Sequence, residues 1–157
     1  MAQLTTPDKA TLAQWLRNAN IESYECDQCA GLHLSALQNA PGVVDARLFI
    51  EDYGVLFSTE LEVRPMAMLP IAADLGRLNM DYPCLKLFLD VVDEAVPQIV
   101  AGATLLAGAG VSPAQVALFI ATVSESVKQL ASECRHLDYL YLVDDSGDQL
   151  PPHQPVH

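Results

Sequence analysis

Two neighbouring stretches of alternating sequence constrain the fold of this chain more than any other feature. Apolar residues, with one threonine among them, occupy every second position from 44 to 50 and again from 55 to 63. A period of two places alternate side chains on opposite faces of a strand. Residues 52–54, Asp-Tyr-Gly, join the two stretches, and a short glycine-containing turn is typical of a hairpin. We therefore expect a β-hairpin, and with it an antiparallel sheet.

Further strands flank this hairpin. Alternation returns from residue 85 to 91, and residues 97–106 provide a partner for it, so a second hairpin is expected. Two shorter strands are expected around 21–25 and 32–37, with a pair of cysteines in the turn between them.

Two helices are expected in the first half of the chain. Thr6-Pro7 offers a hydroxyl cap and a proline at the first helical position, and an asparagine at 18 or 20 can end this helix. Pro65 is placed to start the second helix, which reaches about residue 79. Pro70 lacks a backbone N–H, so we expect an irregular first turn there.

The third helix has the strongest start signal. Ser112 and Gln115 form a capping box, in which each side chain satisfies the backbone N–H of the other residue. A heptad seam follows, made of Val116, Ile120, Val123, Val127, Leu130, Cys134 and Leu137. In a mixed domain such a seam packs on a sheet more often than on another helix. Long crossovers between parallel strands are missing, so the fold class is α+β, an antiparallel sheet with three helices. We expect one domain over residues 1–145 and a disordered tail over 146–157.

The charge balance excludes several classes of partner. Eight Lys and Arg stand against twenty Asp and Glu, a net charge of -12. Nucleic-acid binding depends on basic contacts to phosphates, and an anionic membrane surface would repel this protein, so neither is an expected partner. We see no signal peptide in the first residues, and the apolar run 99–111 is too short to span a bilayer. Four cysteines without a secretion signal favour reduced thiols and a cytoplasmic location.

Chemically active residue types crowd together only around Cys26 and Cys29. With His33 they offer three zinc ligands, and Cys84 or Cys134 would have to supply the fourth. A redox dithiol is the second option, but the adjacent acids Glu25 and Asp27 oppose thiolate formation. We therefore expect a structural turn, silent in catalysis and in metal binding. No nucleotide-binding or hydrolase motif is present, so we expect no cofactor and no enzymatic activity.

The sequence resembles the YbjN family of bacterial regulators, and within it the enterobacterial, AmyR-type members. The residues that carry the likeness are Glu25-Cys26-Asp27-x-Cys29-x-x-Leu32-His33-Leu34, Glu62-Val63-Arg64-Pro65, Ala72-Ala73-Asp74-Leu75, Phe88-Leu89-Asp90 and Leu12-x-x-Trp15-Leu16. The likeness runs from about residue 8 to 145. It implies a fold similar to class I type III secretion chaperones and no catalytic residues. It also implies a homodimer, and negative regulation of exopolysaccharide production, motility, and stress and virulence responses.

Two functional classes stay open at this point. The first is a non-enzymatic regulator that acts through contacts with a protein partner whose identity the sequence does not give. The second is a small metal- or thiol-dependent protein that uses Cys26 and Cys29. For the homodimer we expect the contact on the second helix, and the predicted interface residues are Met66, Leu69, Ala73 and Leu78. The family-motif residues Cys26, Asp27, Cys29, His33, Arg64 and Pro65 are expected to be structural.

Overall fold

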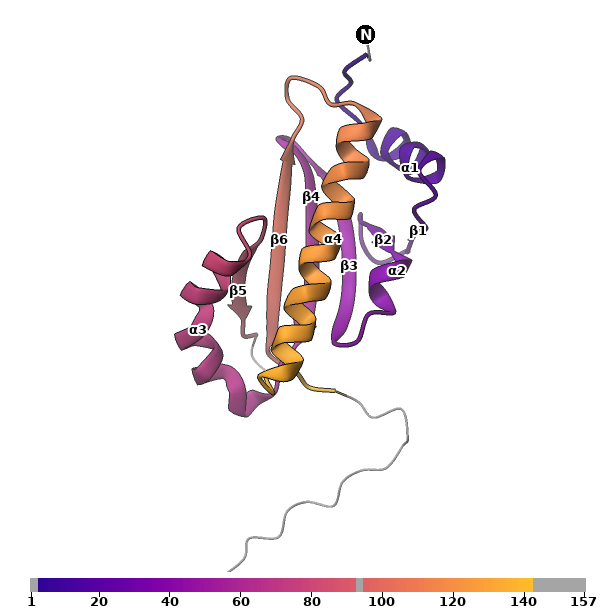
Figure 1. Ribbon diagram of the computed structural model, residues 1–157. Helices are drawn as coiled ribbons and strands as arrows, with labels where there is room; N and C mark the ends of the chain where they lie inside the picture. The colour runs from indigo at the N-terminus through magenta and orange to yellow at the C-terminus, as the bar shows by residue number, and fades with distance from the viewer. Residues whose placement is uncertain (1–2, 93–94, 143–157) are drawn as a thin grey trace, which may run out of the picture.

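Six strands form one antiparallel sheet in the order β1-β2-β3-β4-β6-β5 (Figure 1). The computed structural model describes residues 3–92 and 95–142. The strands are β1 Ser23–Glu25, β2 Leu32–Leu34, β3 Val43–Glu51, β4 Gly54–Glu62, β5 Lys86–Asp90 and β6 Gln98–Leu106. The helices are α1 Lys9–Asn18, α2 Ser35–Gln38, α3 Met68–Asp81 and α4 Pro113–His136, with a 3-10 turn η1 at Pro65–Ala67. The expected α+β class and antiparallel sheet are confirmed. The predicted tail, 146–157, lies outside the described residues.

The central hairpin is confirmed. β3 and β4 pair from Glu51↔Gly54 to Val43↔Leu61, so only Asp52 and Tyr53 form the connection. Gly54 has a φ of +146°, and a Cβ there would lie 2.0 Å from the carbonyl oxygen of Leu105. Glycine is required because β6 approaches β4 closely at this end.

The structure corrects the expected helices at two places. The first helix begins at Lys9, because Asp8 and not Thr6 is its cap: the Asp8 carboxylate accepts a hydrogen bond of 2.7 Å from the Thr11 N–H. The strand expected over 32–37 ends at Leu34, and the following residues form the short helix α2, whose four residues are too few for a periodic pattern. An irregular first turn was expected because of Pro70; the first turn is η1, while Pro70 itself lies in the regular helix α3.

The third predicted helix is α4, which crosses one face of the sheet (Figure 1). Both parts of the Ser112–Gln115 capping box are present. Every seam residue from Val116 to Cys134 is buried, and Phe119 meets Phe57 of β4 edge to face at 6.3 Å between ring centres. Leu137, the last seam position, follows the helix and is partly exposed. The seam therefore packs on the chain's own sheet, as expected.

The sheet face turned away from α4 carries a row of paired residues that crosses all six strands. In order from β1 to β5 the row is Tyr24, His33, Arg47, Ser58, Gly102 and Lys86. The neighbouring row on the α4 side is apolar, and includes Leu32, Leu48 and Phe57. This outer face holds the polar side chains from which the candidate site is built.

Candidate functional site

Three donor atoms converge where the turn after β1 meets β2. The Sγ atoms of Cys26 and Cys29 lie 3.3 Å apart, and the Nε2 atom of His33 lies 3.2 Å from the first and 3.3 Å from the second. The two cysteines stand in the turn, while the pairing Tyr24↔His33 places the imidazole directly beside them. The turn and the strand register thus bring the C-x2-C-x3-H residues into one cluster.

His33 is held on its other side by a chain of hydrogen bonds. Its Nδ1 lies 3.0 Å from Oδ1 of Asp45, and its ring stacks on Tyr24 with 4.7 Å between ring centres and 7° between planes. The Asp45 Oδ1 atom in turn accepts hydrogen bonds of 2.8 Å from Gln38 Nε2 and 2.8 Å from the backbone N–H of Ala46. The ring therefore has one orientation, with Nε2 directed at the two thiols.

Arg47 closes the cluster on the side of β3. Its guanidinium pairs with Glu60 on β4, and it lies over the ring of Phe49 at 5.4 Å from the centre. Although burial works to lower the pKa of Arg47, the carboxylate of Glu60 and the thiol of Cys29 raise it. Gly31 allows this packing, because a Cβ there would lie 2.9 Å from the Phe49 ring and 3.3 Å from the Arg47 Cβ.

The electrostatic setting of Cys26 differs from the sequence-based expectation. Its pKa is lowered to about 7, first by the backbone N–H of Gln28 and then by His33 and Cys29. Burial works to lower the pKa of His33, but its bonds to Cys26 and Asp45 raise it to about 9. The adjacent acids are both exposed, and Glu25 lies 3.6 Å from the Lys9 ammonium. The expectation that they would oppose the thiolate is therefore wrong for Cys26.

Neither of the two cysteines considered as a fourth ligand lies near the cluster. Cys84 is exposed just before β5, at the edge of the sheet opposite β1. Cys134 is fully buried in α4, where burial raises its pKa to about 12. Within residues 3–92 and 95–142, the donor group at this point consists of Cys26, Cys29 and His33 alone.

The other motif residues contribute no donor atom to this cluster. Arg64 forms an ion pair with Asp138, and its backbone N–H donates to the Tyr139 carbonyl at 2.9 Å. Pro65 begins η1, and Asp27 is exposed in the turn. Arg64 and Pro65 thus connect the end of β4 to the segment after α4, and they take no part in the cysteine cluster.

The predicted dimer residues are divided between two sides of η1 and α3. Met66 and Leu69 are 85% and 83% exposed, and Ala73 is exposed as well. Leu78 is fully buried in the chain's own core, so its place in the predicted interface is corrected. A contact through Met66, Leu69 and Ala73 stays a prediction.

A free sheet edge with a hollow on each face is a feature that the sequence analysis missed. β5 pairs with β6 only as far as Lys86↔Gly102, whereas β6 continues to Leu106 (Figure 1). In the described part of the chain, no strand pairs with residues 103–106 on that side. The sequence held one signal for this free edge: the apolar stretch 97–106 is longer than the stretch 85–91 with which it pairs.

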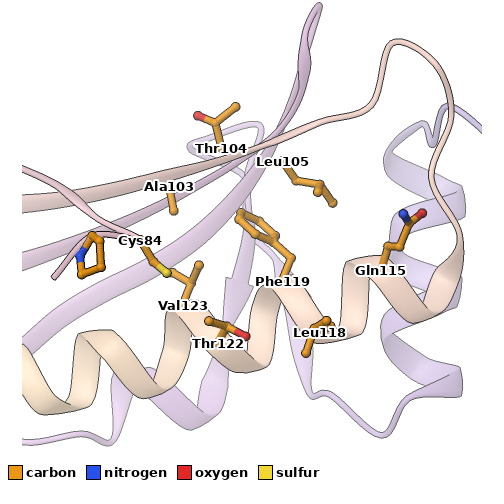
Figure 2. A pocket seen from close by; sticks show the side chains of 10 residues that line it. Cys84, Ala103, Thr104, Leu105, Gln115, Leu118, Phe119, Thr122 and Val123 are labelled. Atoms are coloured by element: carbon orange, nitrogen blue, oxygen red, sulfur yellow. The ribbon is translucent and has the colours of Figure 1, made fainter.

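The first hollow, of about 520 Å³, lies between β6 and α4, where Phe119 and Val123 face Ala103 and Leu105 (Figure 2). The second, of about 480 Å³, lies on the outer face, and its lining includes Tyr53, Leu56 and Phe88. Pro83, Cys84, Ala103 and Thr104 line both hollows. The two hollows therefore meet at the free edge of β6.

Comparison with known proteins identifies relatives of this chain. A family profile, YbjN, described as "Putative bacterial sensory transduction regulator", matches residues 8–136. The chain belongs to the YbjN family. YbjN of Escherichia coli (strain K12) and of Shigella flexneri are each 38% identical to it over 147 residues, which cover 94% of this chain and 93% of the relative.

A solved structure agrees with this assignment. The crystal structure of "YbjN, a putative transcription regulator from E. coli" superposes with a TM-score of 0.87 at 37% identity, covering 90% of this chain and all of that one. The resemblance drawn from the motifs is thus confirmed, and the family description names a regulator. In the described part of the chain, no helix is long and apolar enough to cross a membrane.

Proposed function

We propose that this protein is a non-enzymatic cytoplasmic regulator that acts by binding other proteins. The family likeness supports negative control of exopolysaccharide production, motility, and stress and virulence responses as the processes it serves. A fold similar to class I type III secretion chaperones, which the family resemblance implies, would suit the same mode of action, and we propose that the working form is a homodimer. The observation that carries the proposal is the free edge of β6 between two hollows.

The occupant we propose for this edge is an extended segment of a partner protein. A segment added as a strand would bond to the backbone of residues 103–106, and its successive side chains would point to opposite faces of the sheet. One set of side chains would enter the hollow under Phe119, and the other the hollow beside Phe88. The first hollow therefore suits apolar side chains, whereas the second, whose lining also includes Ser58 and Lys86, suits both apolar and polar ones.

The charge of the chain indicates the chemistry around those apolar residues. With a net charge of -12, the protein attracts basic surfaces and repels acidic ones. We therefore expect the bound segment to carry Lys or Arg outside the hollows, because the charged residue in their lining is itself basic, Lys86. Leu118 and Leu106, which are 69% and 74% exposed at this edge, would become covered on binding.

Site-specific photocrosslinking tests this proposal. A photoreactive amino acid at position 118, in bacteria that express the full chain, should give crosslinked partner segments that mass spectrometry can identify. The same amino acid at Met80, an exposed position on α3, is the matched control. The captured segment is then made as a synthetic peptide and its affinity for the purified protein is measured by fluorescence anisotropy.

The peptide should bind at least ten-fold more weakly to Leu118→Glu, and with unchanged affinity to Met80→Glu. Hydrogen exchange of the amides of residues 103–106 should slow when the peptide is bound, because an added strand protects them. Equal affinity for the two variants, with no protection of these amides, would rule out the β6 edge as the binding site.

A further inference from the structure

We infer that Cys26, Cys29 and His33 form a zinc-binding site with one open coordination position. Zinc in proteins is tetrahedral, with Zn–S near 2.3 Å and Zn–N near 2.0–2.1 Å. These lengths put two ligand sulfurs about 3.8 Å apart, and a sulfur and a nitrogen about 3.5 Å apart. The corresponding distances here are 3.3 Å between sulfurs, and 3.2 and 3.3 Å from sulfur to nitrogen. A movement of about half an ångström would fit the cluster to the ion.

The surroundings of His33 supply a second and independent indication. Histidines that bind a metal through one ring nitrogen almost always donate the other N–H to a carboxylate, carbonyl or water. Here Nε2 faces both thiols, while Nδ1 lies 3.0 Å from the Asp45 carboxylate. Gln38 and the backbone N–H of Ala46 fix that carboxylate in place. The two sulfurs and the imidazole are thus placed as ligands, and the carboxylate is placed as the group that orients the imidazole.

The donor types select the class of ion. Thiolates with an imidazole favour zinc and other thiophilic ions, whereas Mg²⁺ and Ca²⁺ require oxygen ligands. A redox dithiol is the competing use of two such close thiols. In a redox dithiol the contact between Asp45 and His33 would direct the imidazole at one attacking thiol. Here Nε2 lies 3.2 and 3.3 Å from the two sulfurs alike, as expected for three ligands of one ion, so the geometry favours the metal.

The fourth position stays open because Cys84 and Cys134 lie elsewhere in the fold. Sites that keep three protein ligands leave room for water or for an incoming donor atom. The ion would join the turn after β1 to strand β2 at one edge of the sheet. This inference departs from the sequence-based expectation of a silent cysteine pair, which had no means of foreseeing the role of Asp45.

Zinc titration tests the site directly. The full chain is purified, stripped with EDTA, kept reduced with a phosphine, and titrated with Zn²⁺ against a chromophoric chelator. We expect one zinc per chain, and with Co²⁺ the absorption bands of a tetrahedral thiolate complex. Cys29→Ser should weaken zinc binding at least a hundred-fold. Cys84→Ser, which removes a cysteine outside the cluster, is the matched control and should bind as the wild type does.

Asp45 is a positioning residue, and its variant gives a different result. Asp45→Asn should weaken zinc binding ten- to a hundred-fold while the Co²⁺ spectrum keeps its thiolate bands. Circular dichroism checks that each variant is folded. If Cys29→Ser does not fold, alkylation of the wild type decides instead: Zn²⁺ should protect Cys26 and Cys29 but not Cys84. Absence of binding near one equivalent, equal affinity of the two cysteine variants, or recovery of the pair as a disulfide from reducing buffer would overturn the inference.

Discussion

Removing a buried hydroxyl at the centre of the sheet should make this protein more stable. Thr59 on β4 is fully buried, and its Oγ1 has no hydrogen-bond partner among the described residues. Its cross-strand neighbours are Ala46 and Ala101, which offer no polar side chain. An unpartnered buried polar group costs about 1–3 kcal/mol of desolvation. Thr59→Val replaces the hydroxyl with a methyl group, so we expect the free energy of unfolding to rise by about 1–2 kcal/mol.

For a chain of this size, each kcal/mol corresponds to about 2–4 °C in Tm, so the midpoint should rise by roughly 2–8 °C. Urea unfolding followed by far-ultraviolet circular dichroism measures the change in the free energy of unfolding, and thermal unfolding followed by the same signal measures the change in Tm. Thr59→Ser keeps the hydroxyl and loses a methyl group, and should lower stability by about 1 kcal/mol. Thr104→Val, at an exposed position on β6, should stay within about 0.5 kcal/mol of the wild type. A Thr59→Val protein less stable than the wild type would show that the hydroxyl has a partner, such as a buried water.

Three other variants test the packing and the assembly. Met66→Glu with Leu69→Glu should give a folded monomer by light scattering, whereas the wild type should give a mass near twice 17.0 kDa; a dimer that survives both changes would place the contact elsewhere. Leu78→Ala should destabilise the protein by about 2–5 kcal/mol in urea unfolding, and a loss below 1 kcal/mol would contradict its burial. Gly54→Ala should cost more than about 2 kcal/mol, because its Cβ would meet the Leu105 carbonyl; a neutral result in the same assay would show that β6 can move aside.

The sequence predicted those parts of the fold whose signals are local and repeated. The β3–β4 hairpin and the seam of α4 each follow from a regular apolar period, and the Ser112 cap from two residues three apart. At the first helix the prediction chose Thr6 as the cap, whereas the structure places the cap at Asp8, two residues later. The position of β6 between β4 and β5 has no local signal at all, because it depends on pairing between strands distant in sequence.

The site was predictable in its donors and not in its geometry. Cys26, Cys29 and His33 could be picked out because their spacing is short. Asp45 lies twelve positions beyond His33, and only the register between β2 and β3 brings the two together. Proximity in sequence was a poor guide to the charges around the sulfurs. The acids beside the cysteines in sequence are exposed, while the guanidinium of Arg47, on another strand, lies near Cys29. Short spacing thus accounts for the success at this site, and long-range strand pairing accounts for what was missed.

The strand order also has a consequence for how this chain folds. β4 is complete early in synthesis, but its outer partner is β6, which follows only after α3 and β5. Until β6 pairs with it, one edge of β4 has unpaired backbone groups and is open to pairing with other chains. Closing a large loop before the central pairing forms slows folding. Between synthesis of β4 and arrival of β6, the nascent protein therefore passes through a period in which aggregation competes with correct pairing.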